Sequence, residues 1–160
     1  SAVLGSPIPD PIVVFTLWYT TTKEIVHQYN KLFAGKILVD ITNPLNHTYD
    51  DLATPPDSSA AEEIVKVAPK DAKVIKAFNT TFAGLLAQGH VRGQPLDVFI
   101  AGDDAQAKAT IAQLVEEGGQ RAIDAGPLKR ARQLEGVAFL NITLQSKLES
   151  PWMNAVKILA

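Results

Sequence analysis

The feature that most constrains the fold of this sequence is a repeated alternation of short apolar runs with amphipathic stretches. Five runs rich in β-branched residues each precede a segment whose apolar residues recur with helical spacing. This order is typical of βα units that feed a parallel sheet covered by helices on both faces. We therefore expect an α/β fold with a doubly wound, mostly parallel sheet, in which the five runs are all parallel. The predicted strands are residues 12–17, 36–41, 73–78, 97–102 and 121–126.

Capping residues between the runs predict where the helices begin and end. A Ser or Thr followed three residues later by Glu forms a capping box, and an Asp before an apolar helical stripe serves the same purpose. Glycine typically ends a helix. The predicted starts are Thr21 (with Glu24), Ser59 (with Glu62) and Asp103; the predicted ends are Gly35 and 118–119; a short helix is expected within 81–88 and a closing helix from Lys129 to about Leu148.

Composition excludes several classes of function. The chain has 160 residues, with 15 Lys and Arg against 17 Asp and Glu, so no basic field attracts nucleic acid. It has no Cys, which excludes disulfides and thiolate metal sites. No apolar run is long enough to cross a bilayer, and we expect a cytoplasmic protein. The opening residues 1–11, with three prolines, are expected to be a linker before a domain at 12–160.

Ligands of an open α/β sheet bind beyond the carboxyl ends of the strands, and these positions carry aromatic, amide and hydroxyl side chains. Hydrolytic acid-base chemistry needs a positioned ionisable group, and none is expected at these ends. We therefore assign no catalytic residue and no metal ligand. The three histidines match no metal-site spacing, and the adjacent acids at 50–51 are expected to be solvated. The candidate ends are 18–20, 42–45 and 79–81.

Four strings together resemble the NADP oxidoreductases of the coenzyme F-420-dependent family, which are small dinucleotide-binding reductases. They are DITNPLN at 40–46, SSAAEEI at 58–64, KAFNTTFA at 76–83 and GPLKRARQLE at 126–135. The resemblance runs from about Ile12 onward and implies a Rossmann-like domain. The family's GxGxxG phosphate loop is absent, because the ten glycines never have that spacing. The resemblance therefore implies a sheet that is incomplete at its N-terminal side, without the first βαβ unit.

The resemblance also implies a cofactor site and a reaction. The family transfers a hydride between NADP(H) and a deazaflavin, and the same pattern occurs in reductases with a flavin or another small acceptor. Such transfer moves no proton through a side chain, which agrees with the expected lack of acid-base groups at the strand ends. A homodimer is implied as well. Trp18 departs from the family's usual small residue or Pro. The residues that match the family's cofactor site are Leu17, Trp18, Tyr19, Thr42, Asn43, Pro44, Leu45, Phe78, Asn79 and Thr80.

Two other interpretations remain open at this stage. The chain could be a truncated or non-catalytic Rossmann-like module that acts by assembly with another chain through the edge of its first strand. It could also be an α/β enzyme of another class, such as a nucleotide-sugar enzyme, because one fold serves many functions. The sequence does not determine the hydride acceptor or the choice between NADP and NAD.

Overall fold

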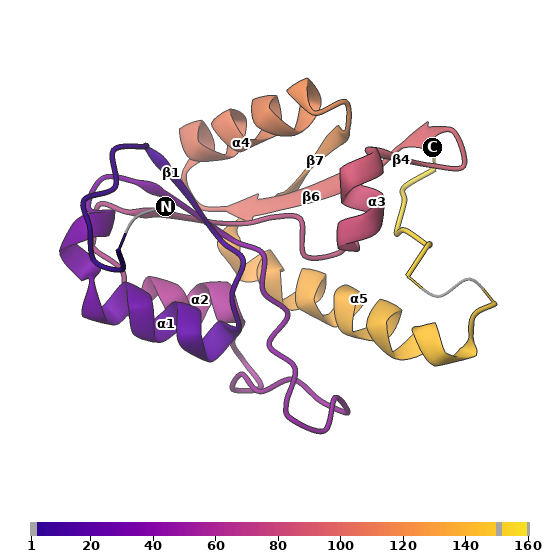
Figure 1. Cartoon of the computed structure of the whole chain (residues 1–160), viewed down its shortest axis with the longest axis horizontal. Helices are drawn as coiled ribbons and strands as arrows, with labels where there is room; N and C mark the ends of the chain where they lie inside the picture. The colour runs from indigo at the N-terminus through magenta and orange to yellow at the C-terminus, as the bar shows by residue number, and fades with distance from the viewer. Residues whose placement is uncertain (1–2, 150–151, 160) are drawn as a thin grey trace.

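The computed structural model describes residues 3–149 and 152–159 of the chain. Residues 1–2 of the predicted linker and residues 150–151 and 160 of the predicted domain lie outside the described residues. Helices and strands alternate as expected (Figure 1). The elements are β1 (Ile12–Phe15), α1 (Tyr19–Gln28), η1 (Asn30–Phe33), β2 (Ile37–Asp40), α2 (Ala60–Val65), β3 (Lys73–Lys76), α3 (Ala83–Gln88), β4 (His90–Val91), β5 (Gln94–Pro95), β6 (Asp97–Gly102), α4 (Ala105–Glu117), β7 (Arg121–Gly126), η2 (Leu128–Arg130), α5 (Ala131–Leu144) and η3 (Gln145–Lys147).

The five predicted strands form one sheet in the order β1-β2-β3-β6-β7. The prediction that all five are parallel is wrong: β3 and β6 pair antiparallel, whereas the β1-β2, β2-β3 and β6-β7 pairs are parallel. Two consecutive strands can pair in parallel only if a crossover returns the chain to the end of the sheet where the first strand began. Between β3 and β6 the chain forms only the six-residue α3, about 9 Å long, and the β4-β5 hairpin. The chain therefore turns back at the end of the sheet where β3 finishes, and β6 runs antiparallel to β3.

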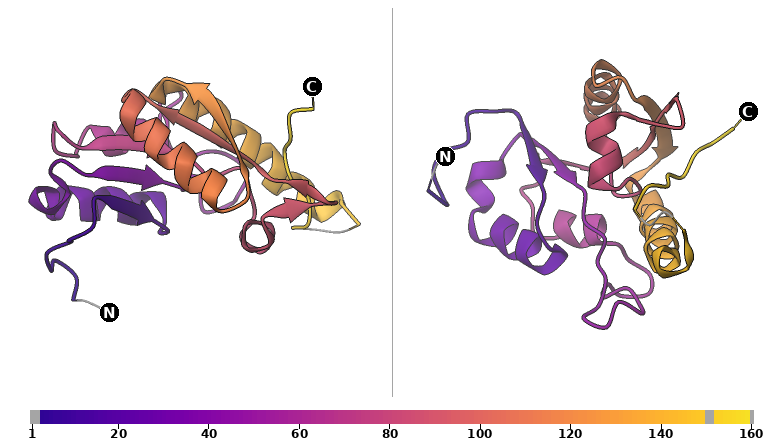
Figure 2. Two further views of the ribbon diagram at one scale, coloured as in Figure 1. Left: turned by 90° about the horizontal axis from the view of Figure 1, so that it is seen from above. Right: turned by 45° about the vertical axis from the view of Figure 1, so that its right-hand side comes forward.

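The sheet is covered on both faces, and each face has its own apolar core. Helix α4 packs on one face, where Val39, Ile75 and Ile111 are buried. Helices α1, α2 and α5 cover the other face, where Leu38 and Ile64 are buried (Figures 1 and 2). Neighbouring residues of one strand face opposite sides of a sheet, so the consecutive apolar residues of β2 serve both cores. The doubly wound arrangement is thus confirmed.

Two of the three predicted helix starts differ from the structure, and one agrees. Ser59 caps α2 as expected, with its side chain accepting the Glu62 N–H. Thr21 caps nothing, because α1 already begins at Tyr19, after an extended Trp18. Asp104, not Asp103, caps α4 by accepting the Ala107 N–H. The Asp103 carboxylate instead accepts the Leu128 N–H and so holds the start of η2.

The described residues on either side of the helices and strands, 3–11 and 152–159, also contact the rest of the fold. Residues 3–11 have no helix or strand, yet Ile8 packs against the core beneath α1. The C-terminal segment leaves α5 and returns to the β6 end of the sheet, where the Ile158 N–H and Lys157 Nζ bond to the buried Asp97 (Figure 2). Arg121 holds the same carboxylate through two hydrogen bonds of 2.8 and 2.6 Å. The division into a linker and one domain stays a prediction.

Candidate functional site

A cavity of about 460 Å³ opens at the carboxyl ends of β1 and β2. Its lining contains five of the ten residues predicted to contact a cofactor, together with side chains from the loop after β2 and from α5. The apolar residues predominate, and Trp18 and Tyr49 remain more than half exposed. A concave, mainly apolar site with a few polar groups is the usual form of a small-molecule site. The lining residues are Thr16, Leu17, Trp18, Ile41, Thr42, Asn43, Leu45, Tyr49 and Ile142.

The other five predicted residues lie outside this lining. Tyr19 lines a separate cavity of about 420 Å³ along α1, with Lys23 and His27. Pro44 is buried, and its carbonyl accepts the Ala53 N–H. The remaining three, Phe78, Asn79 and Thr80, follow β3, and of these Asn79 bonds to the lining residue Asn43. Phe78 has φ 64°, a left-handed backbone that is uncommon for a residue other than glycine.

An asparagine pair joins the loops that follow β2 and β3. Asn43 Nδ2 donates to the Asn79 carbonyl at 2.9 Å, and Asn79 Nδ2 donates to Asn43 Oδ1 at 3.0 Å. Asn79 Nδ2 also donates to the carbonyl of Leu134, in α5, at 3.0 Å. Asn43 is one of the residues predicted to contact a cofactor. In the structure most of this amide is used to fix the loop, which leaves one N–H for a ligand.

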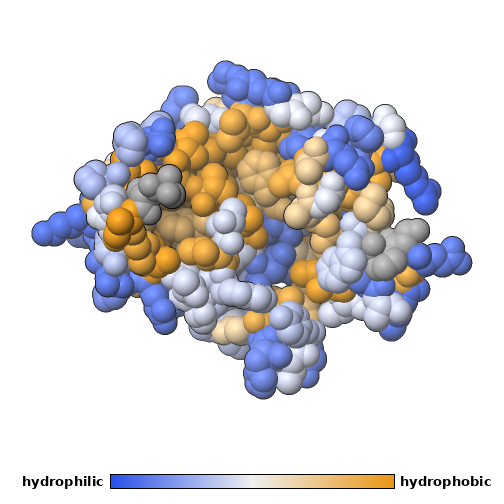
Figure 3. Space-filling view, viewed as in Figure 1, coloured by the Kyte–Doolittle hydropathy of each residue, from blue (hydrophilic) through white to orange (hydrophobic). Residues whose placement is uncertain are grey.

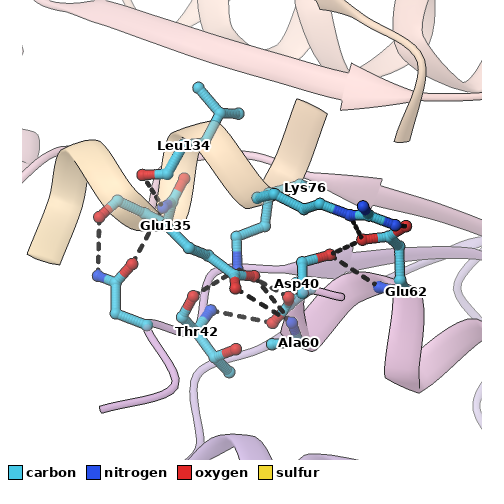
Figure 4. Close-up of polar contacts among 11 residues, drawn as sticks. Asp40, Thr42, Ala60, Glu62, Lys76, Leu134 and Glu135 are labelled. Atoms are coloured by element: carbon cyan, nitrogen blue, oxygen red, sulfur yellow. Dashed lines mark hydrogen bonds and ion pairs between the residues drawn. The ribbon is translucent and has the colours of Figure 1, made fainter. Parts of the chain in front are cut away.

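A buried ionic triad lies next to Thr42, one of the residues that line the cavity (Figure 4). Lys76, the last residue of β3, extends its ammonium toward Asp40, the last residue of β2, and toward Glu135 of α5. Lys76 Nζ lies 2.9 Å from Asp40 Oδ2 and 2.8 Å from Glu135 Oε1, and it donates to the Thr42 carbonyl. All three side chains are at most 1% exposed. The parallel register pairs Asp40 with Lys76, which brings the opposite charges together.

The two carboxylates of the triad are also bonded to the backbone. Asp40 Oδ1 accepts the Thr42 N–H at 2.9 Å, and Glu135 accepts the Ala60 N–H through both oxygens at 3.0 and 3.1 Å. Burial raises the pKa of Glu135, and Asp40 adds to this, while Lys76 and the Ala60 N–H act in the opposite direction. The expectation that no ionisable group stands at a strand end is therefore wrong, because both Asp40 and Lys76 end strands.

Comparison with known proteins places the chain in a family. The chain is 33% identical over 146 residues to an F420-dependent NADP reductase of Methanocaldococcus jannaschii, which covers 87% of this chain and 64% of that protein. A crystal structure from Arthrobacter sp. FB24, assigned as an F420-dependent NADP reductase, superposes with a TM-score of 0.84 and 33% identity, covering 94% of this chain and 69% of that one. The chain belongs to the F420-dependent NADP reductase family.

The similarity extends to a second group of reductases. The chain is 32% identical over 139 residues to metalloreductase STEAP3 of Rattus norvegicus, covering 84% of this chain and 25% of the rat protein. No family profile matches the sequence. The chain spans just under two thirds of the length of the Methanocaldococcus reductase. The Rossmann-like fold and the predicted resemblance to F420-dependent NADP reductases are thus confirmed.

The cavity fits a nicotinamide ring better than it fits the phosphates of a dinucleotide. Two buried polar atoms beside it, Thr42 Oγ1 and Asn79 Oδ1, have no hydrogen-bond partner among the described residues. A buried polar atom without a partner is costly, and a carboxamide offers both donors and an acceptor. The lining has no Lys or Arg for a phosphate, and these 160 residues contain no GxGxxG loop. The lining therefore offers polar groups suited to a carboxamide and none suited to a phosphate.

The remaining predicted features have ordinary surroundings. Within the described residues, no group of three His, Asp or Glu side chains could hold a metal ion. Asp50 accepts hydrogen bonds from Thr48 and Asn46, and these bonds lower its pKa. Arg132, in the first turn of α5, pairs with Glu62. No helix in the part of the chain that the structure describes has the length and apolar character to span a membrane.

Proposed function

We propose that this chain forms the ring-binding part of an NADP(H)-dependent oxidoreductase, which transfers a hydride between the nicotinamide and a deazaflavin of the F420 type. The cavity at the carboxyl ends of β1 and β2 carries this proposal. Its lining combines aromatic and aliphatic side chains with a hydroxyl and an amide, and the described lining includes no carboxylate, imidazole or ammonium group. The names of the relatives supply NADP and F420.

The lining suits a reaction in which the protein positions two rings and excludes water. The bound nicotinamide would supply the hydride chemistry. The chain's own contribution is orientation: the Thr42 hydroxyl and the free N–H of Asn43 can bond a ring carboxamide, and Leu17 and Ile142 exclude water from its neighbourhood. Because Lys76 bonds the backbone carbonyl of Thr42 and Asn79 bonds the side-chain amide of Asn43, these donors are held in place before a ligand binds.

Several finer points stay predictions of the family resemblance. The acceptor could be a flavin or another small molecule in place of the deazaflavin. The preference for NADP over NAD depends on a 2′-phosphate site, and the lining of this cavity contains no Lys or Arg that could form one. The homodimer and the cytoplasmic location also stay predictions.

One observation favours the alternative of an assembly module. β1 is an edge strand of the sheet, and its Val14 is 46% exposed. In the orientation of Figure 1, the space-filling view shows apolar residues gathered toward the left and the top, with hydrophilic residues along the rim (Figure 3). An exposed edge strand can pair with a further strand. Size-exclusion chromatography with light scattering tests this alternative, since a strict monomer over a wide concentration range contradicts it.

The proposed reaction is tested with NADPH labelled with deuterium at the transferred position. The chain is mixed with labelled NADPH and F420 or FMN, and the label is followed into the acceptor by mass spectrometry. Direct transfer supports the proposal, and the absence of NADPH oxidation with every acceptor contradicts it. In Thr42→Val, which removes the unpartnered hydroxyl, we expect KM for NADPH to rise about threefold to tenfold, the effect of one hydrogen bond. Thr110→Val on α4 is the matched control and should leave KM unchanged.

A further inference from the structure

The hydrogen-bond partners of the buried triad determine its charge. The described partners of the Glu135 carboxylate are all donors, namely Lys76 Nζ and the Ala60 N–H. Asp40 likewise accepts from Lys76 and from the Thr42 N–H. A protonated carboxyl would need an acceptor for its own O–H. Lys76 in turn directs its three N–H groups to three oxygens. Two carboxylates therefore face one ammonium, and the triad carries a net charge of about −1.

This charge lies next to the cavity and is separated from it by a single residue. The Thr42 N–H bonds to Asp40 and the Thr42 carbonyl bonds to Lys76, while Thr42 itself lines the cavity. The lining residues have no formal charge to offset the triad. Because the three side chains are buried, water screens their field less than it screens a surface pair.

We propose that the Asp40–Lys76–Glu135 triad makes this site prefer the oxidised, positively charged nicotinamide ring to the reduced, neutral ring. This inference rests on the proposed function. When a reduced nicotinamide gives up a hydride, that is one proton and two electrons, the acceptor gains them and the nicotinamide ring gains one positive charge. A net negative triad stabilises this ring and thereby favours transfer from NADPH to the acceptor. Glu135 is then a specificity-determining residue that acts through its charge.

The first test uses the unmodified chain and two small probes of similar shape. 1-Methylnicotinamide is a cation, and 3-methylbenzamide is its neutral counterpart. Binding is followed by NMR, with the backbone amides of Thr42 and Asn43 reporting on the site. Unit charges about 10 Å apart at an effective dielectric constant of about 40 change an affinity about fourfold, so we expect the cation to bind about fourfold more tightly. Equal binding of both probes at this site overturns the inference alone. Binding of neither overturns the proposed function as well.

The second test assigns the preference to the triad. Glu135→Gln removes one negative charge and keeps an oxygen that can accept from Lys76. We expect this variant to lose the preference for the cation while its affinity for the neutral probe stays the same. A purely structural role would weaken both probes alike, which would overturn the inference. Glu63→Gln is the matched control, because Glu63 is also a buried carboxylate, but it bonds Lys23, Lys66 and Ser58 away from the cavity. It should retain the preference.

Discussion

Replacing Lys76 by Met should destabilise the fold strongly, because it removes the cation that two buried carboxylates share. Lys76 is fully buried, and Met has a similar length, so packing changes little. Asp40 and Glu135 would then face each other with one backbone N–H each. Removing one partner of a buried ion pair costs about 3–5 kcal/mol. A domain of this size is stable by about 5–15 kcal/mol, so the variant should lose a large part of its stability.

The assay is urea unfolding followed by circular dichroism, with Lys108→Met as the matched control. Lys108 pairs with the exposed Asp124 at 2.8 Å, and an exposed pair contributes about 0–1 kcal/mol. We expect the free energy of unfolding to fall by about 3–5 kcal/mol in Lys76→Met and by less than about 1 kcal/mol in the control. Equal losses in the two variants would refute the reasoning, because the triad would then contribute no more than a surface pair.

The pH dependence of this loss follows from Glu135. Its pKa is raised in the folded protein, chiefly by burial, so the folded state binds the proton more tightly than the unfolded state does. Its contribution to stability is therefore complete below the ordinary pKa of glutamate and is lost as pH rises through the raised pKa. Without Lys76 that pKa should rise further. The difference between Lys76→Met and the unmodified chain should then be smaller in acid, where Glu135 is neutral, than at alkaline pH.

Two further changes test other parts of the fold. Asp97→Asn should release the C-terminal segment, which limited proteolysis detects. In the unmodified chain, burial raises the pKa of Asp97, but Arg121, the Ile158 N–H and Lys157 together lower this pKa to about 2. The stabilisation by Asp97 is therefore present above the ordinary pKa of aspartate and is lost as pH falls through about 2. Ser59→Ala should lower the free energy of unfolding by about 1 kcal/mol by removing the cap of α2, and thermal unfolding that matches the unmodified chain would contradict this role.

Local sequence signals predicted the elements of the fold well. The runs at 97–102 and 121–126 match β6 and β7 residue for residue, because flanking glycines and polar residues mark both ends. Ser59 caps α2 as predicted, since a capping box is completed within four residues. The direction of β6 is not such a local property. It depends on how far α3 and the β4-β5 hairpin carry the chain, and this distance is visible only in the structure.

The triad could not be predicted by examining one strand end at a time. Asp40 and Lys76 stand inside apolar runs, where a charged residue needs a partner if it is buried. This was the available signal: two charges of opposite sign end two consecutive strands, and a parallel register pairs them. Glu135 gave a weaker signal, as a carboxylate on the buried face of α5 beside Leu134 and Ala138. Its distance from Lys76 depends on how α5 packs against the sheet.

The position of α5 connects the cavity and the triad. This one helix supplies Ile142 to the cavity lining, Glu135 to the triad and the Leu134 carbonyl to Asn79. A shift of α5 would therefore change the shape of the cavity and the charge behind it together. Glu135→Gln should alter only the charge, whereas Asn79→Ala should loosen the helix and affect both. If the two variants changed the affinities for a neutral and a cationic ring in the same proportion, the charge of Glu135 would have no separate effect on the ring.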